Sequence, residues 1–326
     1  MKRREFITLL GGAAAAWPLA ARTQGVNRPR VGYLFTSEKA EGQGLWEACR
    51  QGLRELGYKE GENIILEPRW TEGHQEQLPS LVKELLGLNV AVLVTAATPA
   101  SLAAKVATNT TPIVFVAVAD PVSVGPVASL ARPGSNVTGL SLLTSDLSGK
   151  RLELLREIVH NISRVAILMN PDNPSNTIFL EQTQLAAQKL GIALDASNAR
   201  SPDDVEKAFA APASQHTDAL IVFDDPVLWS YRQQIVSLAA AQRLPAMYGY
   251  SDFVDAGGLI SYGPDRLDQY RRTAIYVDKI LRGAKPADLP VEQPIKFELI
   301  VNRKTATALG VSLPPPITVS ADKIID

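Results

Sequence analysis

The sequence twice places an Asp-Pro-Val triplet directly after an apolar run. The first, VAVADPV, contains Asp120, and the second, VFDDPV, contains Asp224 and Asp225. Proline stops a strand, so each carboxylate should stay at the end of its strand, where it could pair with the ammonium group of a ligand. Each aspartate could equally be a helix cap or a turn residue. That all three are only caps is the less favoured interpretation.

The elements that must position these residues alternate between strand and helix. Strands that are apolar on both faces and alternate with helices indicate a parallel sheet covered on both sides. The predicted strands span 30–35, 63–70, 90–95 and 112–118, then 163–169, 193–199, 218–223 and 244–250, and the predicted helices span 44–58, 78–88, 99–107, 177–192, 202–211 and 228–243.

The two halves of the chain repeat the same order of elements. The strands near Val31, Val90 and Pro112 are offset by about 59 and 81 residues, and those near Val165, Ala219 and Pro245 by about 54 and 80, a period too long for a solenoid. We therefore expect an α/β protein with two similar doubly wound, Rossmann-like lobes and a hinge. Segments 136–141 and 257–263 should each add an edge strand, and the elements after residue 266 are surplus to the repeat.

The division between the lobes follows from those surplus elements. Terminal elements that return to the first lobe would leave several chain crossings, which limit motion to opening and closing. We expect residues 28–142 plus 264–292 to form lobe 1, and residues 143–263 plus 293–326 to form lobe 2.

Residues 1–23 have the layout of an export signal. Basic residues at 2–4 precede an apolar run from Phe6 to Trp17 and the small residues Ala20 and Ala21. The pair Arg3-Arg4 resembles a twin-arginine signal. A membrane anchor is the alternative, but the run is too short for a hydrocarbon core of roughly 30 Å. The predicted location is the periplasm with the signal peptide removed, and the cleavage point stays open.

Composition excludes several classes of function. The 326 residues are 46% hydrophobic and carry a net charge of −1, so nothing favours a disordered chain or a nucleic-acid partner. No dinucleotide-binding fingerprint, Walker loop or nucleophile elbow is present, and we expect no enzyme activity, cofactor or metal. The three histidines share no spacing.

The single cysteine, Cys49, lies on an apolar helix face and is predicted to be a buried thiol.

The carboxyl ends of the predicted strands define the candidate site. Ligands of open parallel sheets bind beyond these ends. A helix that starts at Thr98-Pro99 would direct free backbone N–H groups at a ligand carboxylate. An aromatic wall could come from Tyr33, Phe35, Trp229, Tyr231, Tyr248, Tyr250 and Tyr262.

Three long stretches resemble the periplasmic substrate-binding proteins of ABC importers, in the tryptophan/tyrosine-type group. They are DPVSVGPVASLARPGSNVTGLS, FVDAGGLISYGPD and YRRTAIYVDKILRGAKPADLPVEQPIKFELIVNRKTATALG. The resemblance implies a type I periplasmic-binding fold that captures a small solute between its lobes and delivers it to an ABC permease in the inner membrane. It implies ligand-binding roles for Thr36, Ser37, Ala97, Thr98, Asp120, Asn170, Asp224, Tyr248 and Ser251.

The nature of the solute and some alternatives stay open. The expected ligands are amino acids, aromatic ones included, or related carboxylates. Two departures from the resemblance could favour another small carboxylate: a polar loop at LFTSEKAEG, and Ser251 in GYSDF, where many relatives look to have Arg. The same fold could serve a sensor that presents solute to a membrane receptor, or less plausibly an α/β enzyme. A LacI-type regulator is close to excluded, because the N-terminus lacks a helix-turn-helix. We expect a monomer.

Overall fold

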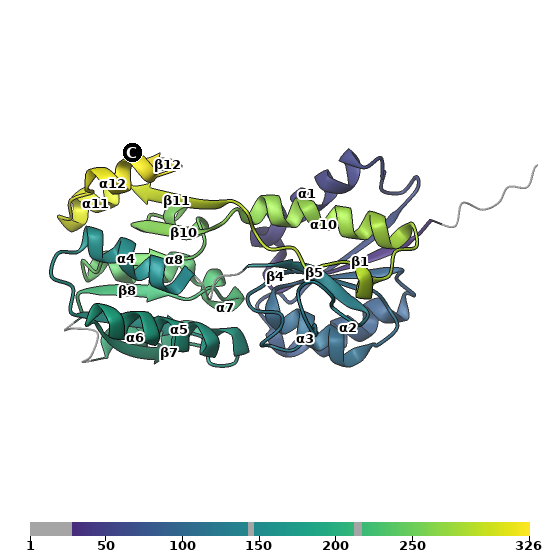
Figure 1. Ribbon diagram of the computed structural model, residues 1–326, viewed down its shortest axis with the longest axis horizontal. Helices are drawn as coiled ribbons and strands as arrows, with labels where there is room; N and C mark the ends of the chain where they lie inside the picture. Colours follow the sequence, from purple (N-terminus) through teal and green to yellow (C-terminus); the bar gives the residue numbers. More distant parts are fainter. Residues whose placement is uncertain (1–27, 143–146, 212–216) are drawn as a thin grey trace, which may run out of the picture.

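A computed structural model describes residues 28–142, 147–211 and 217–326. The predicted export signal at residues 1–23 lies outside the described residues. The described chain forms two α/β lobes, each built around its own sheet (Figure 1). Among these residues, no helix combines the length and the apolar character that a membrane crossing requires.

The first sheet forms lobe 1 and consists of parallel strands in the order β2-β1-β3-β4-β5. Buried aliphatic side chains from both faces of β3 and β4 explain why two helical layers are needed to cover it. The strands are β1 (Arg30–Phe35), β2 (Ile65–Trp70), β3 (Val92–Ala96), β4 (Ile113–Val118) and β5 (Val137–Ser141), and the helices are α1 (Lys39–Glu55), α2 (Leu78–Gly87) and α3 (Ala97–Ala107), with a 3₁₀ turn at Gln75–Gln77.

The second sheet forms lobe 2 in the order β12-β11-β10-β9-β8-β6-β7. Its part β7-β6-β8-β9-β10 repeats the strand order of the first sheet, which confirms the predicted duplication. The expectation that segment 257–263 forms an edge strand was wrong, because β11 pairs with β10 antiparallel and β12 extends the sheet further. The strands are β6 (Arg164–Met169), β7 (Ala193–Asn198), β8 (Ala219–Val222), β9 (Ala246–Tyr248), β10 (Ile260–Pro264), β11 (Phe297–Asn302) and β12 (Lys323–Ile325).

The helices of lobe 2 differ from the expected set in two ways. The helix predicted over 228–243 is two helices: Asp225 caps a short one that starts at Pro226, and a second one follows after Tyr231. A helix over Ser148–Ile158 was not predicted. The helices are α4 (Ser148–Ile158), α5 (Pro174–Leu190), α6 (Pro202–Ala210), α7 (Pro226–Ser230), α8 (Arg232–Ala241), α9 (Asp252–Asp255), α11 (Arg303–Leu309) and α12 (Pro315–Ser320).

Helix α10 (Arg266–Leu281) leaves lobe 2 after β10 and packs on α1 of lobe 1 (Figure 1). Gly52 makes this close approach possible, since a Cβ at that position would lie 2.0 Å from the carbonyl oxygen of Arg271. A 3₁₀ turn at Pro286–Asp288 follows, and the chain then returns to lobe 2 as β11. The N-terminus of α10 therefore lies where the chain passes from one lobe to the other.

Candidate ligand-binding site

A pocket with about 360 Å³ of empty space lies between the two lobes. Lobe 1 and the start of α10 contribute most of the lining, and lobe 2 closes it. The lining residues are Phe35, Thr36, Ser37, Leu45, Ala96, Ala97, Ala117, Pro226, Trp229, Tyr250, Arg266 and Tyr270.

Aromatic rings form much of the pocket wall. Phe35 stacks on Trp70 at 5.4 Å and on Tyr270 at 6.3 Å between ring centroids. Trp229 and Tyr250 approach from lobe 2. Burial raises the pKa of Tyr270 to about 12 and that of Tyr250 well above its usual value, so both phenols stay neutral at physiological pH. A flat apolar ligand with a polar end fits such a wall.

The backbone at the pocket has an unusual conformation at two alanines. Ala97 has a φ of 66° and Ala117 a φ of 61°, in the left-handed region that non-glycine residues rarely adopt. Ala97 is the first residue of α3, and the register of β4 against β5 shifts around Ala117. Strained backbone of this kind costs about 1–3 kcal/mol per residue and concentrates at functional sites.

The N-terminus of α3 faces the pocket without a side-chain cap. Ala96 occupies the cap position and offers no side-chain acceptor, and both Ala96 and Ala97 line the pocket. The hydroxyl groups of Thr36 and Ser37 make no hydrogen bond with other described residues. Together these groups leave donors available for an anion.

Arg266 supplies a fixed positive charge at the same place. Its Nη1 donates to Oδ2 of Asp252 at 2.8 Å, and its guanidinium lies 4.2 Å from the ring centroid of Tyr250 and 4.8 Å from that of Trp229. Burial opposes the charge, but Asp252 and the two tyrosines at 250 and 270 raise the pKa of Arg266 overall. Its buried Nε has no hydrogen-bond partner among the described residues. Because buried polar groups are normally hydrogen-bonded, this N–H group is available to donate to a ligand.

Direct contacts hold the two lobes together around the pocket. The hydroxyl of Thr98 on α3 lies 2.8 Å from the hydroxyl of Ser175 on α5, and both side chains are buried. Nη1 of Arg232 donates to Oε1 of Glu41 at 2.9 Å. These contacts define a closed arrangement of the lobes.

A buried polar network supports the lobe 2 side. Asp225 caps α7 by accepting from the backbone N–H groups of Val227 and Leu228, and it accepts from the side-chain amides of Asn170 and Asn173. Burial raises the pKa of Asp225, although these donors act in the opposite direction. Asp225 is therefore a helix cap, which is one of the roles that the sequence left open for it.

Asp224 forms a separate buried ion pair. Its Oδ2 accepts from Nη2 of Arg151 at 3.0 Å, and both side chains are almost completely buried. Gly249 packs directly against this pair, because a Cβ there would lie 1.6 Å from Oδ1 of Asp224. The pair therefore requires glycine at position 249.

The residues expected to contact ligand occupy different environments. Thr36, Ser37 and Ala97 line the pocket, and Thr98 makes the contact between the lobes. Asn170 and Asp224 are buried in the contacts described above and do not line the pocket. Asp120 accepts from the backbone and hydroxyl of Ser123, Tyr248 stacks on Phe253 at 4.6 Å in the core, and Ser251 lines a separate groove.

The sequence analysis assigned no site role to the two lining residues that come from α10. Arg266 and Tyr270 belong to α10, which is surplus to the duplicated unit. The only signal in the sequence for a site residue here was the position of Arg266, shortly after the last strand of the duplicated unit at 257–263.

Neither cysteine nor metal chemistry is evident in the described residues. Cys49 is fully buried, as predicted, and burial raises the pKa of its thiol to about 12. No group of three or more His, Cys, Asp or Glu side chains within the described ranges could hold a metal ion.

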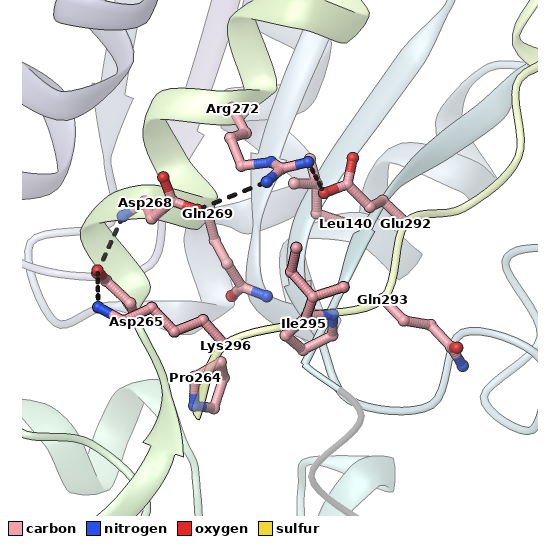
Figure 2. Close-up of a pocket in the computed structure, with 11 residues that line it drawn as sticks. Leu140, Pro264, Asp265, Asp268, Gln269, Arg272, Glu292, Gln293, Ile295 and Lys296 are labelled. Carbon is pink, nitrogen blue, oxygen red and sulfur yellow. Dashed lines mark hydrogen bonds and ion pairs between the residues drawn. The ribbon is translucent and has the colours of Figure 1, made fainter. Parts of the chain in front are cut away.

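A second pocket lies where the chain crosses between the lobes (Figure 2). Arg272 on α10 pairs with Glu292 on the returning segment, and Lys296 pairs with Glu298 at 2.7 Å. Gln269 points into this pocket and donates to the carbonyl of Ser141 at 2.8 Å. This second pocket shares no lining residue with the pocket between the lobes. Its charged side chains connect α10 to the crossing segment.

Comparison with known proteins shows the family of this chain. A family model described as ABC transporter substrate binding protein matches residues 39–325. The tyrosine-binding protein of Clostridioides difficile (strain R20291) is 26% identical over 84% of this chain and 77% of that protein.

Solved structures agree with that match. A conserved domain protein from Vibrio cholerae O1 biovar El Tor is 30% identical with a TM-score of 0.87, over 91% of this chain and 99% of that one. An ABC domain from Streptococcus pneumoniae, solved in complex with L-Trp, is 24% identical with a TM-score of 0.84, over 91% of this chain and all (100%) of that one. The expected fold, two parallel-sheet lobes of the periplasmic-binding type, is confirmed.

Proposed function

Because the chain belongs to the ABC transporter substrate-binding protein family, we propose that it captures a small aromatic carboxylate in the pocket between its lobes and delivers it for import. The chain is a solute-binding component of an ABC transporter and not an enzyme. Aromatic carboxylates include the aromatic amino acids, and the homologues bind tyrosine or were solved with L-Trp.

The observation that carries this proposal is the pairing of aromatic walls with anion donors in one pocket. Phe35, Trp229 and Tyr250 suit a ring, while Arg266 and the uncapped start of α3 suit a carboxylate. Burying a ring of this kind also removes apolar surface from water, which contributes about 25 cal/mol per Å².

Closure of the lobes would follow from contacts that ligand makes with both of them. A ligand shifts the balance between open and closed forms only through its greater affinity for the closed form. The pocket supports this behaviour, because its lining comes from lobe 1, lobe 2 and α10 together. The lobe boundaries expected from the sequence, 28–142 plus 264–292 and 143–263 plus 293–326, would be the moving bodies.

The cellular setting completes the proposal. We place the mature protein in the periplasm after export through the twin-arginine-like signal at residues 1–23, as a monomer that docks on an ABC permease in the inner membrane. Presentation of the solute to a membrane receptor is the alternative partner, and co-purification with one or the other distinguishes them.

Isothermal titration of the mature protein tests the ligand class. The panel contains aromatic amino acids, aromatic acids without an amine, aliphatic carboxylates and aromatic amines without a carboxylate. We expect binding in the first two groups only. Saturable binding confined to the aliphatic acids or to the amines would contradict the proposal.

A single variant connects the binding to this pocket. The Ser37 hydroxyl has no partner among the described residues, so Ser37→Ala should leave folding intact while it weakens ligand binding. Ser80→Ala, at an exposed serine on α2, is the matched control. Equal affinities of the two variants would argue against the pocket.

A further inference from the structure

One arginine connects a wall residue of the pocket between the lobes to the opposite lobe. Nη1 of Arg232, on α8 of lobe 2, donates to Oε1 of Glu41 on α1 of lobe 1 at 2.9 Å. The same nitrogen donates to the main-chain carbonyl of Trp229 at 3.0 Å. Trp229 lines the pocket, and Arg232 and Glu41 are not among its lining residues.

We infer that Arg232 is a positioning residue that couples ligand binding at Trp229 to closure of the lobes. The inference rests on the proposed function and describes how the closed form of that site is held. Arg232 acts through two other residues, because it fixes the Trp229 ring in lobe 2 and pairs with Glu41 in lobe 1.

Arg232 holds Trp229 by two different contacts. Besides the hydrogen bond to the main-chain carbonyl, Cζ of its guanidinium lies 4.6 Å from the centroid of the Trp229 ring. This distance is typical of a cation–π contact. Trp229 lies near the end of α7, a helix of only five residues. The position of the Trp229 ring therefore depends on where the Arg232 side chain is held.

The ion pair with Glu41 belongs to the closed form, because its two members come from different lobes. The side chains of Arg232 and Glu41 are only 17% and 23% exposed, so closure removes much of the water around both charges. Oε2 of Glu41 is buried and has no hydrogen-bond donor among the described residues. Loss of either partner would leave the other charge poorly compensated in the closed form, which favours opening and faster ligand release.

The opposite charges of the two residues separate an ion pair from a general electrostatic effect. If the two side chains acted only through their fields, Arg232→Gln would weaken the binding of an anionic ligand and Glu41→Gln would strengthen it. If they act as a pair, both substitutions weaken binding. Arg164→Gln is the matched control, since Arg164 pairs with Asp195 at 2.8 Å within lobe 2.

Titration calorimetry of the mature protein and its variants tests the inference, with stopped-flow tryptophan fluorescence to follow dissociation. The ligands are aromatic amino acids and aromatic acids that lack an amine, with L-tyrosine and 3-phenylpropionate first. We expect Arg232→Gln and Glu41→Gln each to bind at least about fivefold more weakly, through faster dissociation. The double variant should bind no more weakly than Arg232→Gln, because the pair is already broken. Arg164→Gln should bind like the wild type.

The outcomes separate this inference from the proposed function. Unchanged or tighter binding by Glu41→Gln, or additive losses in the double variant, would overturn the inference and leave the proposed function standing. A loss of amino-acid binding in Glu41→Gln but not in Arg232→Gln would make Glu41 a contact of the ligand ammonium group, and would also overturn the inference. If the folded, ligand-free wild type bound no aromatic carboxylate, both would be contradicted.

Discussion

The hydroxyl of Thr98 lies 2.8 Å from the hydroxyl of Ser175, and this buried contact joins the first turn of α3 in lobe 1 to the first turn of α5 in lobe 2. The two helices start at the carboxyl ends of strands β3 and β6, so the contact brings together the ligand-facing edges of both sheets. It can exist only while the lobes are closed.

Thr98→Val removes this contact and should weaken ligand binding. In the closed form the substitution leaves the buried Ser175 hydroxyl without its partner, which costs about 1–3 kcal/mol, or roughly 5- to 150-fold in the dissociation constant. In the open form water can satisfy Ser175, so the unliganded protein should keep its thermal stability. Titration calorimetry measures the effect, and Thr98→Ser, which keeps the hydroxyl, should bind like the wild type. An unchanged affinity of the valine variant would show that the contact does not stabilise the closed form.

Arg266→Gln should weaken the binding of an aromatic carboxylate by about 1.5–3 kcal/mol, because a charge-assisted hydrogen bond is lost. The same substitution leaves Asp252 without its cation, so the double variant with Asp252→Asn separates the ligand contact from that side effect. Arg271→Gln on the exposed face of α10 is the matched control. If the double variant regained wild-type affinity, Arg266 would not be a ligand contact.

Gly249→Ala should destabilise the fold severely. The new Cβ would lie 1.6 Å from Oδ1 of Asp224 and 2.4 Å from Nη2 of Arg151, and breaking a buried ion pair costs about 3–5 kcal/mol. Gly149→Ala in α4 is the control, since its Cβ meets only Ala186 at 3.7 Å and alanine is the better helix former by about 0.5–1 kcal/mol. Urea unfolding of both variants checks the contrast. Equal midpoints would mean that the Asp224–Arg151 pair can shift without cost.

Asp218 should make stability depend on pH below about 4, near the ordinary pKa of an aspartate. Backbone hydrogen bonds from Ser163 and then from Arg164 lower the pKa of Asp218. A carboxyl whose pKa is lower in the folded state stabilises the protein above the unfolded pKa, and that stabilisation is lost as pH falls through the folded pKa. Urea unfolding between pH 5 and 3, a range chosen to span this loss, should show a shallower decline for Asp218→Asn than for the wild type. A decline of the same slope would assign the acid sensitivity to other groups.

The sequence predicted the fold better than it predicted the site. The duplicated strand order could be read from runs such as 30–35 and 163–169, because strands buried on both faces are apolar throughout. Helix α4 was missed although Leu152, Leu155 and Ile158 have helical spacing, since its cap position at Leu147 carries no capping side chain.

The site residues show why local patterns were insufficient. Asp120 follows its strand as predicted, but its carboxylate bonds to Ser123 three residues later, a local contact that competes with ligand contacts. Tyr248 and Tyr250 are both aromatic residues at the end of β9, and only Tyr250 lines the pocket. Which of the two faces the pocket depends on tertiary structure. Arg266 reaches the pocket only because α10 crosses to lobe 1.

The central claim, that the pocket between the lobes holds an aromatic carboxylate by its anionic end, is tested most directly by a crystal structure of the mature protein with 3-phenylpropionate. We predict closed lobes, the ring against Trp229 and Tyr250, and the carboxylate within hydrogen-bonding distance of Arg266 and the first amides of α3. A ligand bound elsewhere, or one whose carboxylate points away from both of these groups, would contradict the claim.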